Sequence, residues 1–168
     1  MKDSSDGSGR KNTAEIFRKL RDQVLALSAK DVAGAPLPTG VFGALMEFTA
    51  GPTWVSLIAI LDGTTSLYFG SGGGIIGAGK SEIVRKANHL FLEVAGQFVN
   101  RFPKTQSYPT PQPDHVRFYL LTSDGVRASD EIQEQMLQQR GNELFPLYAA
   151  AQNVITQIRL VQGKQQQR

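Results

Sequence analysis

The dipeptide Asp62-Gly63 separates two apolar segments, and this arrangement limits the possible folds more than any other feature of the chain. The first segment, residues 54–61 (WVSLIAIL), is nearly all apolar, which is typical of a central strand covered on both faces. An Asp-Gly pair favours a two-residue turn between adjacent antiparallel strands. We therefore predict a hairpin whose second strand covers residues 64–70 (TTSLYFG).

The two-residue turn also fixes a register for this hairpin. It places Ile60 opposite Thr65 and Ile58 opposite Leu67. Because side chains alternate between faces, one face of the sheet is expected to carry Trp54, Ile58, Ile60, Leu67 and Phe69. The other face is expected to carry Leu57, Leu61 and Tyr68. Asp62 is interpreted as a turn residue rather than a metal ligand, because Asp-Gly is itself turn chemistry.

Two further segments have the pattern of strands. Residues 41–49 (VFGALMEFT) predict a strand that a turn at residues 50–52 joins to the hairpin, with Phe42, Met46 and Phe48 on one face. Residues 115–122 (HVRFYLLT) predict a later strand with Val116, Phe118 and Leu120 on one face. A short return strand at Val126–Arg127 is expected to follow a turn at residues 123–125.

Four segments predict helices. The first covers residues 12–29, because Asn12 and Glu15 have the spacing of a capping box and apolar side chains then recur on one face. The other three are expected at residues 80–101, at residues 131–140, and from residues 142–146 to a glycine stop at Gly163.

The order of these elements predicts a single α+β domain over residues 12–162. Its sheet is expected to be an antiparallel β-meander of three strands plus one or two later strands, with helices packed mainly on one face. Residues 1–11 are polar and rich in serine and glycine, so we expect a disordered N-terminal tail there. Residues 163–168 are expected to be a frayed C-terminal tail.

The predicted order of elements resembles that of small scaffolding domains of the roadblock, longin and profilin type. The resemblance lies in topology alone, and no motif identifies the chain as a member of any of these families. Three strands before the second long helix also depart from the usual roadblock order. Function therefore has to be argued from the residues themselves.

Charge and composition narrow the partners that we expect. The 168-residue chain has a net charge of +3, but residues 1–31 carry +2, residues 157–168 carry +3, and the stretch between them carries −2. No basic stripe interleaved with aromatic residues is present, so a nucleic-acid partner is not expected. The chain contains no cysteine, no apolar leader at its start, and no run near the roughly 18 apolar residues of a membrane span. We therefore expect a cytoplasmic protein without membrane contact.

The sharpest functional motif lies in the glycine-rich loop. Residues 74–81 (GIIGAGKS) fit the phosphate-loop pattern G-x-x-x-x-G-K-[ST]. At Gly74, Gly79, Lys80 and Ser81 the segment resembles the P-loop nucleotidases, which implies phosphate binding and a nucleotide cofactor with magnesium. Those folds use parallel strands linked by right-handed crossovers, whereas this chain is expected to form a hairpin directly before the loop. A magnesium-binding aspartate at the end of a later apolar strand is also missing, because Asp124 follows His115–Leu121 only after Thr122 and Ser123.

We therefore expect an interaction or scaffold domain that has a protein partner or self-associates through a sheet edge or a helix face. No catalytic residues, cofactor or metal site are assigned in this interpretation. His89 and Glu93 lie one helical turn apart and are interpreted as a solvated pair. The alternative is a phosphate- or nucleotide-binding protein that uses Gly74 to Ser81, and the strand order of the sheet bears on the choice between them.

Overall fold

One antiparallel sheet organises the computed structural model, which describes residues 6–35 and 37–168. Within these residues the sheet has seven strands in the order β4-β3-β2-β1-β5-β6, and β7 also pairs with β5. The strands are β1 (Val41–Ala50), β2 (Thr53–Ile60), β3 (Thr65–Phe69), β4 (Gly74–Ile75), β5 (His115–Thr122), β6 (Gly125–Ala128) and β7 (Ile132–Gln133). Every pairing is antiparallel, which confirms the predicted α+β meander.

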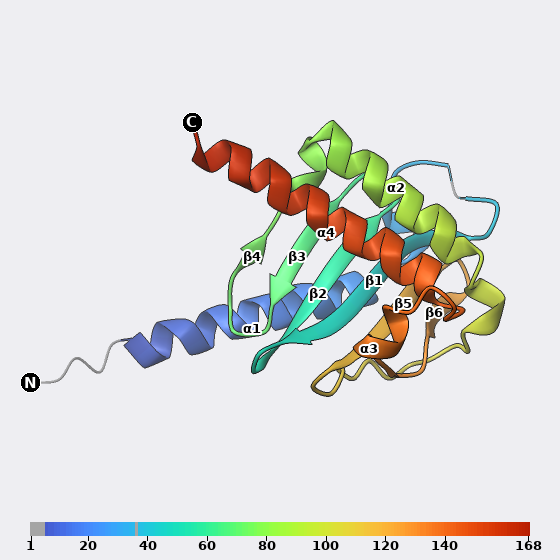
Figure 1. Ribbon diagram of the computed structural model, residues 1–168, viewed down its shortest axis with the longest axis horizontal. Coiled ribbons are helices and arrows are strands. Elements are labelled where there is room, and N and C mark those ends of the chain that lie inside the picture. Colours follow the sequence, from blue (N-terminus) through green and yellow to red (C-terminus); the bar gives the residue numbers. More distant parts are fainter. Residues whose placement is uncertain (1–5, 36) are drawn as a thin grey trace, which may run out of the picture.

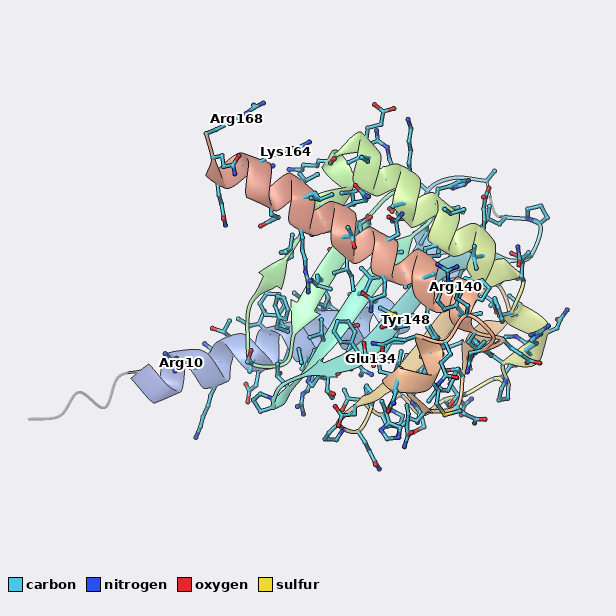
Figure 2. The ribbon with its side chains drawn as sticks, viewed as in Figure 1. Arg10, Glu134, Arg140, Tyr148, Lys164 and Arg168 are labelled. Carbon is cyan, nitrogen blue, oxygen red and sulfur yellow. The ribbon has the colours of Figure 1, made fainter. Side chains whose placement is uncertain are left out.

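Helices cover both faces of this sheet unequally (Figure 1). The helices α2 (Glu82–Gly96) and α4 (Phe145–Gln166) pack against each other on one face. The helix α1 (Asp6–Leu25) crosses the opposite face, and its N-terminal half extends past the sheet (Figure 1). The short helix α3 (Glu134–Leu137) precedes α4, and the Tyr148 hydroxyl of α4 donates a hydrogen bond to Glu134 Oε1 at 2.9 Å (Figure 2).

Each face of the sheet has its own apolar core. Beneath α2 and α4 the buried side chains of the sheet include Ala44, Met46, Val55, Leu57, Leu67, Val116, Phe118 and Leu120. Beneath α1 they include Phe42, Leu45, Ile58, Ile60, Tyr68, Tyr119 and Leu121. The predicted shared face of Val116, Phe118 and Leu120 is confirmed by this division.

The predicted register of the Asp62-Gly63 hairpin is wrong by one residue. Leu57 pairs with Leu67 and Ile58 with Ser66, so Leu67 lies on the α2–α4 face and Tyr68 on the α1 face. The turn contains three residues, Leu61 to Gly63, because the Ile60 amide donates to the Thr64 carbonyl. Gly63 has φ +95°, which is the left-handed position that a three-residue hairpin loop requires.

The predicted common face of Phe42, Met46 and Phe48 is also only partly correct. Met46 and Phe48 contact the core beneath α2 and α4, whereas Phe42 lies beneath α1. The pairing of β1 with β5 shifts between Val41 and Gly43. A β-bulge of this kind inserts one residue and reverses the side-chain alternation on either side of it.

Several predicted helix boundaries also differ from the structure. The helix α1 begins at Asp6 rather than at Asn12, so residues 6–11 are helical, and residues 1–5 of the predicted tail lie outside the described residues. Helix α4 continues through Gly163 to Gln166, since a helical glycine costs only about 1 kcal/mol. The predicted helix over residues 131–140 is reduced to α3, because Ile132 and Gln133 pair with β5 instead. Helix α2 is shorter than predicted, and a single 3-10 turn, Val99–Arg101, follows it.

Candidate functional site

The glycine-rich loop connects the edge strand β4 to helix α2. Gly74 lies in β4, Gly79 and Lys80 lie in a 3-10 turn (Ala78–Lys80), and Ser81 is the residue before α2. The four residues that the motif predicts therefore belong to one connection, and Lys80 and Ser81 line one cavity.

The two motif glycines are required by contacts within the protein itself. A β-carbon at Gly79 would collide with the carbonyl oxygen of Gly63, in the turn between β2 and β3. A β-carbon at Gly74 would collide with the carbonyl oxygen of Leu67 and would lie 2.8 Å from the ring of Phe17. Close approach of backbone segments thus explains both glycines without a bound ligand.

The backbone amides of the loop are partly engaged in local hydrogen bonds. The Lys80 amide donates to the Gly77 carbonyl and the Ser81 amide to the Ala78 carbonyl, both at 3.2 Å. In a phosphate loop, successive amides of this stretch point at the anion instead. The strand that leads into the loop, β4, pairs antiparallel with β3, unlike the parallel strands of the P-loop nucleotidases. Phosphate binding by Gly74, Gly79, Lys80 and Ser81 therefore stays a prediction that rests on the motif.

The cavity beside the loop has a volume of about 220 Å³ and lies between the loop and the last turns of α4. Its apolar lining consists of Ile75, Ile76, Ala78, Val84, Ile158 and Val161. Polar groups are contributed by Lys80, Ser81, Gln162 and Gln165. The cavity therefore combines an aliphatic surface with one lysine, one hydroxyl and two side-chain amides.

The charges at this end of the molecule are mainly basic. Among the residues that the structure describes, Lys80 forms no ion pair, and the Ser81 side chain does not cap α2. Glu82, the acid nearest in sequence, pairs with Lys86 at 3.3 Å. Figure 2 shows Lys164 and Arg168 at the C-terminal end of α4, which is the end that contributes Gln162 and Gln165 to the cavity.

The outward surface of α2 carries exposed apolar side chains. Ile83 is 52% exposed and Leu90 is 48% exposed, and they lie seven residues apart on the same side of the helix. Polar side chains surround them in two intrahelical contacts, Glu82 with Lys86 and His89 with Glu93 at 3.2 Å. We call the stripe formed by Ile83, Lys86, Leu90 and Glu93 the α2 outer face.

A buried ion pair on the opposite side of the sheet was not predicted from the sequence. The Arg21 guanidinium of α1 donates to both carboxylate oxygens of Glu47 in β1, at 2.6 and 2.8 Å. Glu47 is fully buried and Arg21 is 5% exposed. Ser56 also donates to Glu47, at 2.9 Å. Glu47 was recognisable as the one acidic residue inside an otherwise apolar strand, because a buried carboxylate needs a partner.

The same arginine also holds the proline-rich segment of residues 103–114 in place. Arg21 Nη2 donates to the Tyr108 carbonyl at 2.9 Å, and the guanidinium lies 5.9 Å from the centres of the Trp54 and Tyr119 rings. The Tyr119 hydroxyl donates to the Pro109 carbonyl at 2.6 Å. Burial, and then the charge of Glu47, raise the pKa of Tyr119 to about 12. This cluster is a structural connection between α1, the sheet and the segment.

Asp62, which the sequence interprets as a turn residue, has that structural role. Asp62 accepts a hydrogen bond from the Thr64 amide at 2.9 Å, as a turn residue does. Across residues 6–35 and 37–168, no three His, Asp or Glu side chains converge as a metal site. No helix in this part of the chain is long and apolar enough to cross a membrane.

Comparisons of the chain with protein-family models, with curated proteins and with solved structures found no match. The function therefore has to be inferred from the arrangement of residues alone.

Proposed function

We propose that this protein is an interaction domain that self-associates through the α2 outer face. The observation that carries the proposal is the exposure of Ile83 and Leu90, two large aliphatic side chains one heptad apart on α2. Exposed apolar side chains at this spacing are typical of a helix that packs against another helix. Both residues leave water when a second copy of the helix covers this stripe.

The charges on the α2 outer face are complementary to those of a second copy. Lys86 and Glu93 lie on either side of Leu90, four residues before it and three residues after it. When two copies of α2 pack antiparallel about a two-fold axis that passes beside Leu90, Lys86 of one copy lies opposite Glu93 of the other, and the reverse holds as well. In this arrangement the stripe is self-complementary in charge, and the Leu90 side chains of the two copies meet near the axis.

The edges of the sheet support a helix-mediated contact over a strand-mediated one. The outer edge of β6 is already paired, because the Thr105 amide donates to the Val126 carbonyl and the Ala128 amide donates to the Pro103 carbonyl. The opposite edge, β4, has only two residues, and a strand this short offers few hydrogen bonds to a partner.

A contact between single helices buries little area, so we expect weak and concentration-dependent association. Sedimentation velocity over a dilution series is the direct test. We expect the sedimentation coefficient to fall toward the monomer value on dilution. A Leu90→Asp variant is expected to sediment as a monomer at every concentration.

Ile16 on α1 provides the matched control, because it is 49% exposed, compared with 48% for Leu90. An Ile16→Asp variant places the same charge at the same exposure on the other side of the sheet, and it is expected to associate like the wild type. A wild type that is monomeric at every concentration contradicts the proposal. Equal loss of association in both variants contradicts the assignment to α2.

A further inference from the structure

We propose that Asp62, in the turn between β2 and β3, is a site of spontaneous isomerisation to isoaspartate in the folded protein, and that Asp124, in the turn between β5 and β6, is protected from it. Glycine follows the aspartate in both turns. A third Asp-Gly pair, Asp6-Gly7, lies in α1 and not in a turn. The proposal does not depend on self-association, because every group involved belongs to one copy of the chain.

The reaction needs only water and the groups that an Asp-Gly pair contains. The glycine nitrogen attacks the side-chain carboxyl carbon of the aspartate, a C–N bond forms, and the carboxyl hydroxyl leaves with the amide proton as water. Water then opens the resulting succinimide ring at either carbonyl, which restores aspartate or gives isoaspartate. Glycine favours ring closure because it has no β-carbon to hinder the approach of its nitrogen.

Three side chains hold the Asp124 carboxylate. The Thr122 hydroxyl donates to Asp124 Oδ1 at 2.6 Å, and Lys104 Nζ and Arg127 Nη2 lie 3.0 and 3.6 Å from Oδ2. The hydrogen bonds from Thr122 and Lys104 lower the pKa of this carboxyl to about 2. An ionised carboxylate is a much poorer electrophile than a protonated carboxyl group, and its three partners also fix its orientation. Both effects slow ring closure at Asp124.

The Asp62 carboxylate is held by one backbone group instead. Its Oδ1 accepts a hydrogen bond from the Thr64 amide at 2.9 Å. Among the residues that the structure describes, Asp62 forms no ion pair. The basic side chains that line a cavity together with Asp62 are Arg85, Lys86 and His89. Since none of them pairs with Asp62, its carboxyl group is freer than that of Asp124 to react.

The glycines of the two turns do not account for this difference. The Gly63 amide donates to the Ile60 carbonyl at 3.0 Å, and Gly125 is the residue of β6 that pairs with Thr122. Both glycines are therefore constrained by a hairpin, and we expect both turns to react more slowly than the unfolded chain. The contacts of the two carboxylates then decide which aspartate reacts faster in the folded protein.

Isoaspartate at Asp62 adds one backbone atom to a turn that supports the glycine-rich loop. A β-carbon at Gly79 would collide with the Gly63 carbonyl oxygen, so the loop packs directly on this turn. The Thr64 carbonyl accepts a hydrogen bond from Asn88 of α2 at 3.0 Å. A longer turn displaces both carbonyls, so the modification loosens the contact of the turn with the loop and with α2.

Peptide mapping of the full chain by mass spectrometry tests the proposal. The folded protein is incubated in mildly acidic buffer, and electron-transfer fragmentation then distinguishes isoaspartate from aspartate at each position. We expect isoaspartate to accumulate several-fold faster at Asp62 than at Asp124. A parallel incubation in concentrated urea removes both turns, so we expect the two rates to converge there.

Two variants separate the contributions of the two sites. A double variant, Thr122→Val with Lys104→Met, removes two contacts of Asp124 and is expected to raise isomerisation there several-fold without changing the rate at Asp62. Asp62→Glu keeps the charge but replaces the five-membered ring of the intermediate with a less favourable six-membered one. It is expected to remove the signal at this position and to leave Asp124 unchanged. Circular dichroism of each variant confirms that it is folded before incubation.

Any of three results overturns the proposal. Isomerisation of the folded protein that is as fast at Asp124 as at Asp62 shows that the contacts of Asp124 do not protect it. Absence of isoaspartate at Asp62 in the folded protein, when the unfolded chain forms it, shows that the turn blocks the reaction. A difference between the two sites that persists unchanged in urea shows that the neighbouring sequence, and not the fold, causes it.

Discussion

The two faces of the sheet are held by different kinds of contact. On the α1 face a charged pair, Arg21 with Glu47, is buried among aromatic rings and connects the helix to the strand. On the α2–α4 face the core is apolar, with neutral hydrogen bonds such as the one from Asn88 to Thr65 at 2.6 Å. A buried ion pair fixes geometry at a cost in desolvation, whereas apolar packing tolerates change more readily.

The difference extends to the outer surfaces of the helices. Four of the six large apolar side chains that are most exposed within the described part of the chain lie on the glycine-rich loop, α2 and α4: Ile76, Ile83, Leu90 and Leu160. We therefore propose a structural role for the α1 side and a binding role for the α2–α4 side. The predictions below test that division.

The largest expected effect is on the α1 side. Replacing Glu47 with alanine leaves the Arg21 guanidinium buried without its carboxylate, which we expect to lower the free energy of unfolding by about 3–5 kcal/mol. Urea denaturation followed by circular dichroism measures this change. The double variant Arg21→Met with Glu47→Leu removes both charges, and we expect it to recover most of the lost stability. A double variant as unstable as Glu47→Ala would show that the charges themselves are not the cause.

The next effect is on the α2–α4 side, at the loop that enters α2. Gly79→Ala forces a β-carbon against the Gly63 carbonyl, and overpacking of this kind is expected to cost about 1–3 kcal/mol. Gly141→Ala is the control, because a β-carbon there meets no atom of the described residues within 4 Å. Thermal unfolding of the two variants compares them. Equal melting temperatures would mean that the Gly79 contact is not a constraint.

Alkaline pH is expected to weaken the cluster around Tyr119 on the α1 side. The pKa of Tyr119 is raised to about 12, because burial and the charge of Glu47 disfavour the phenolate. The unfolded chain loses this proton near pH 10, so the folded state loses stability as the pH rises from about 10 to 12. A Tyr119→Phe variant has no phenol at this position, so we expect it to lack this loss of folding stability at alkaline pH. Unfolding free energies at pH 9 and pH 11 measure it, and identical pH dependence in both proteins would contradict the assignment.

The smallest effect is expected at the turn between β5 and β6, which lies outside both helix layers. Hydrogen bonds from Thr122 and Lys104 lower the pKa of Asp124 to about 2. The stability that Asp124 contributes is present above its usual pKa near 4 and is lost as the pH falls toward 2. Because Asp124 is solvent-exposed, we expect only a slight change in acid stability for Asp124→Asn. Carboxyl chemical shifts followed by NMR test the lowered pKa.

The sequence predicts local structure well where one segment determines it. The bounds of β5 are those predicted, because the alternation in residues 115–122 and the Ser123–Gly125 turn are both local signals. The register of β2 with β3 was not predictable in the same way, since Asp-Gly fits both two-residue and three-residue turns and only packing selects one. The bulge near Gly43 depends on contacts with Leu121 and Ile60, which are distant in the sequence.

The candidate sites also differ in how far the sequence alone predicts them. Ile83 and Leu90 are visible in the sequence as apolar residues of the α2 segment, but only the packing of α2 shows that they are exposed while its other apolar side chains are buried. The cavity was not predictable at all, because Ile158 and Val161 reach the loop only through the packing of α4 on α2. The phosphate-loop pattern identifies Gly74 and Gly79 in the sequence. Their close approach to Leu67 and Gly63 depends on the tertiary structure and was not predictable.

Sedimentation equilibrium of charge-reversed α2 variants tests the central claim most directly. Lys86→Glu alone and Glu93→Lys alone each place like charges opposite one another across the proposed two-fold axis, so both are expected to weaken self-association several-fold. The double variant restores opposite charges in exchanged positions, and its dissociation constant is expected to return close to that of the wild type. A double variant that associates no better than either single variant would contradict self-association through the α2 outer face.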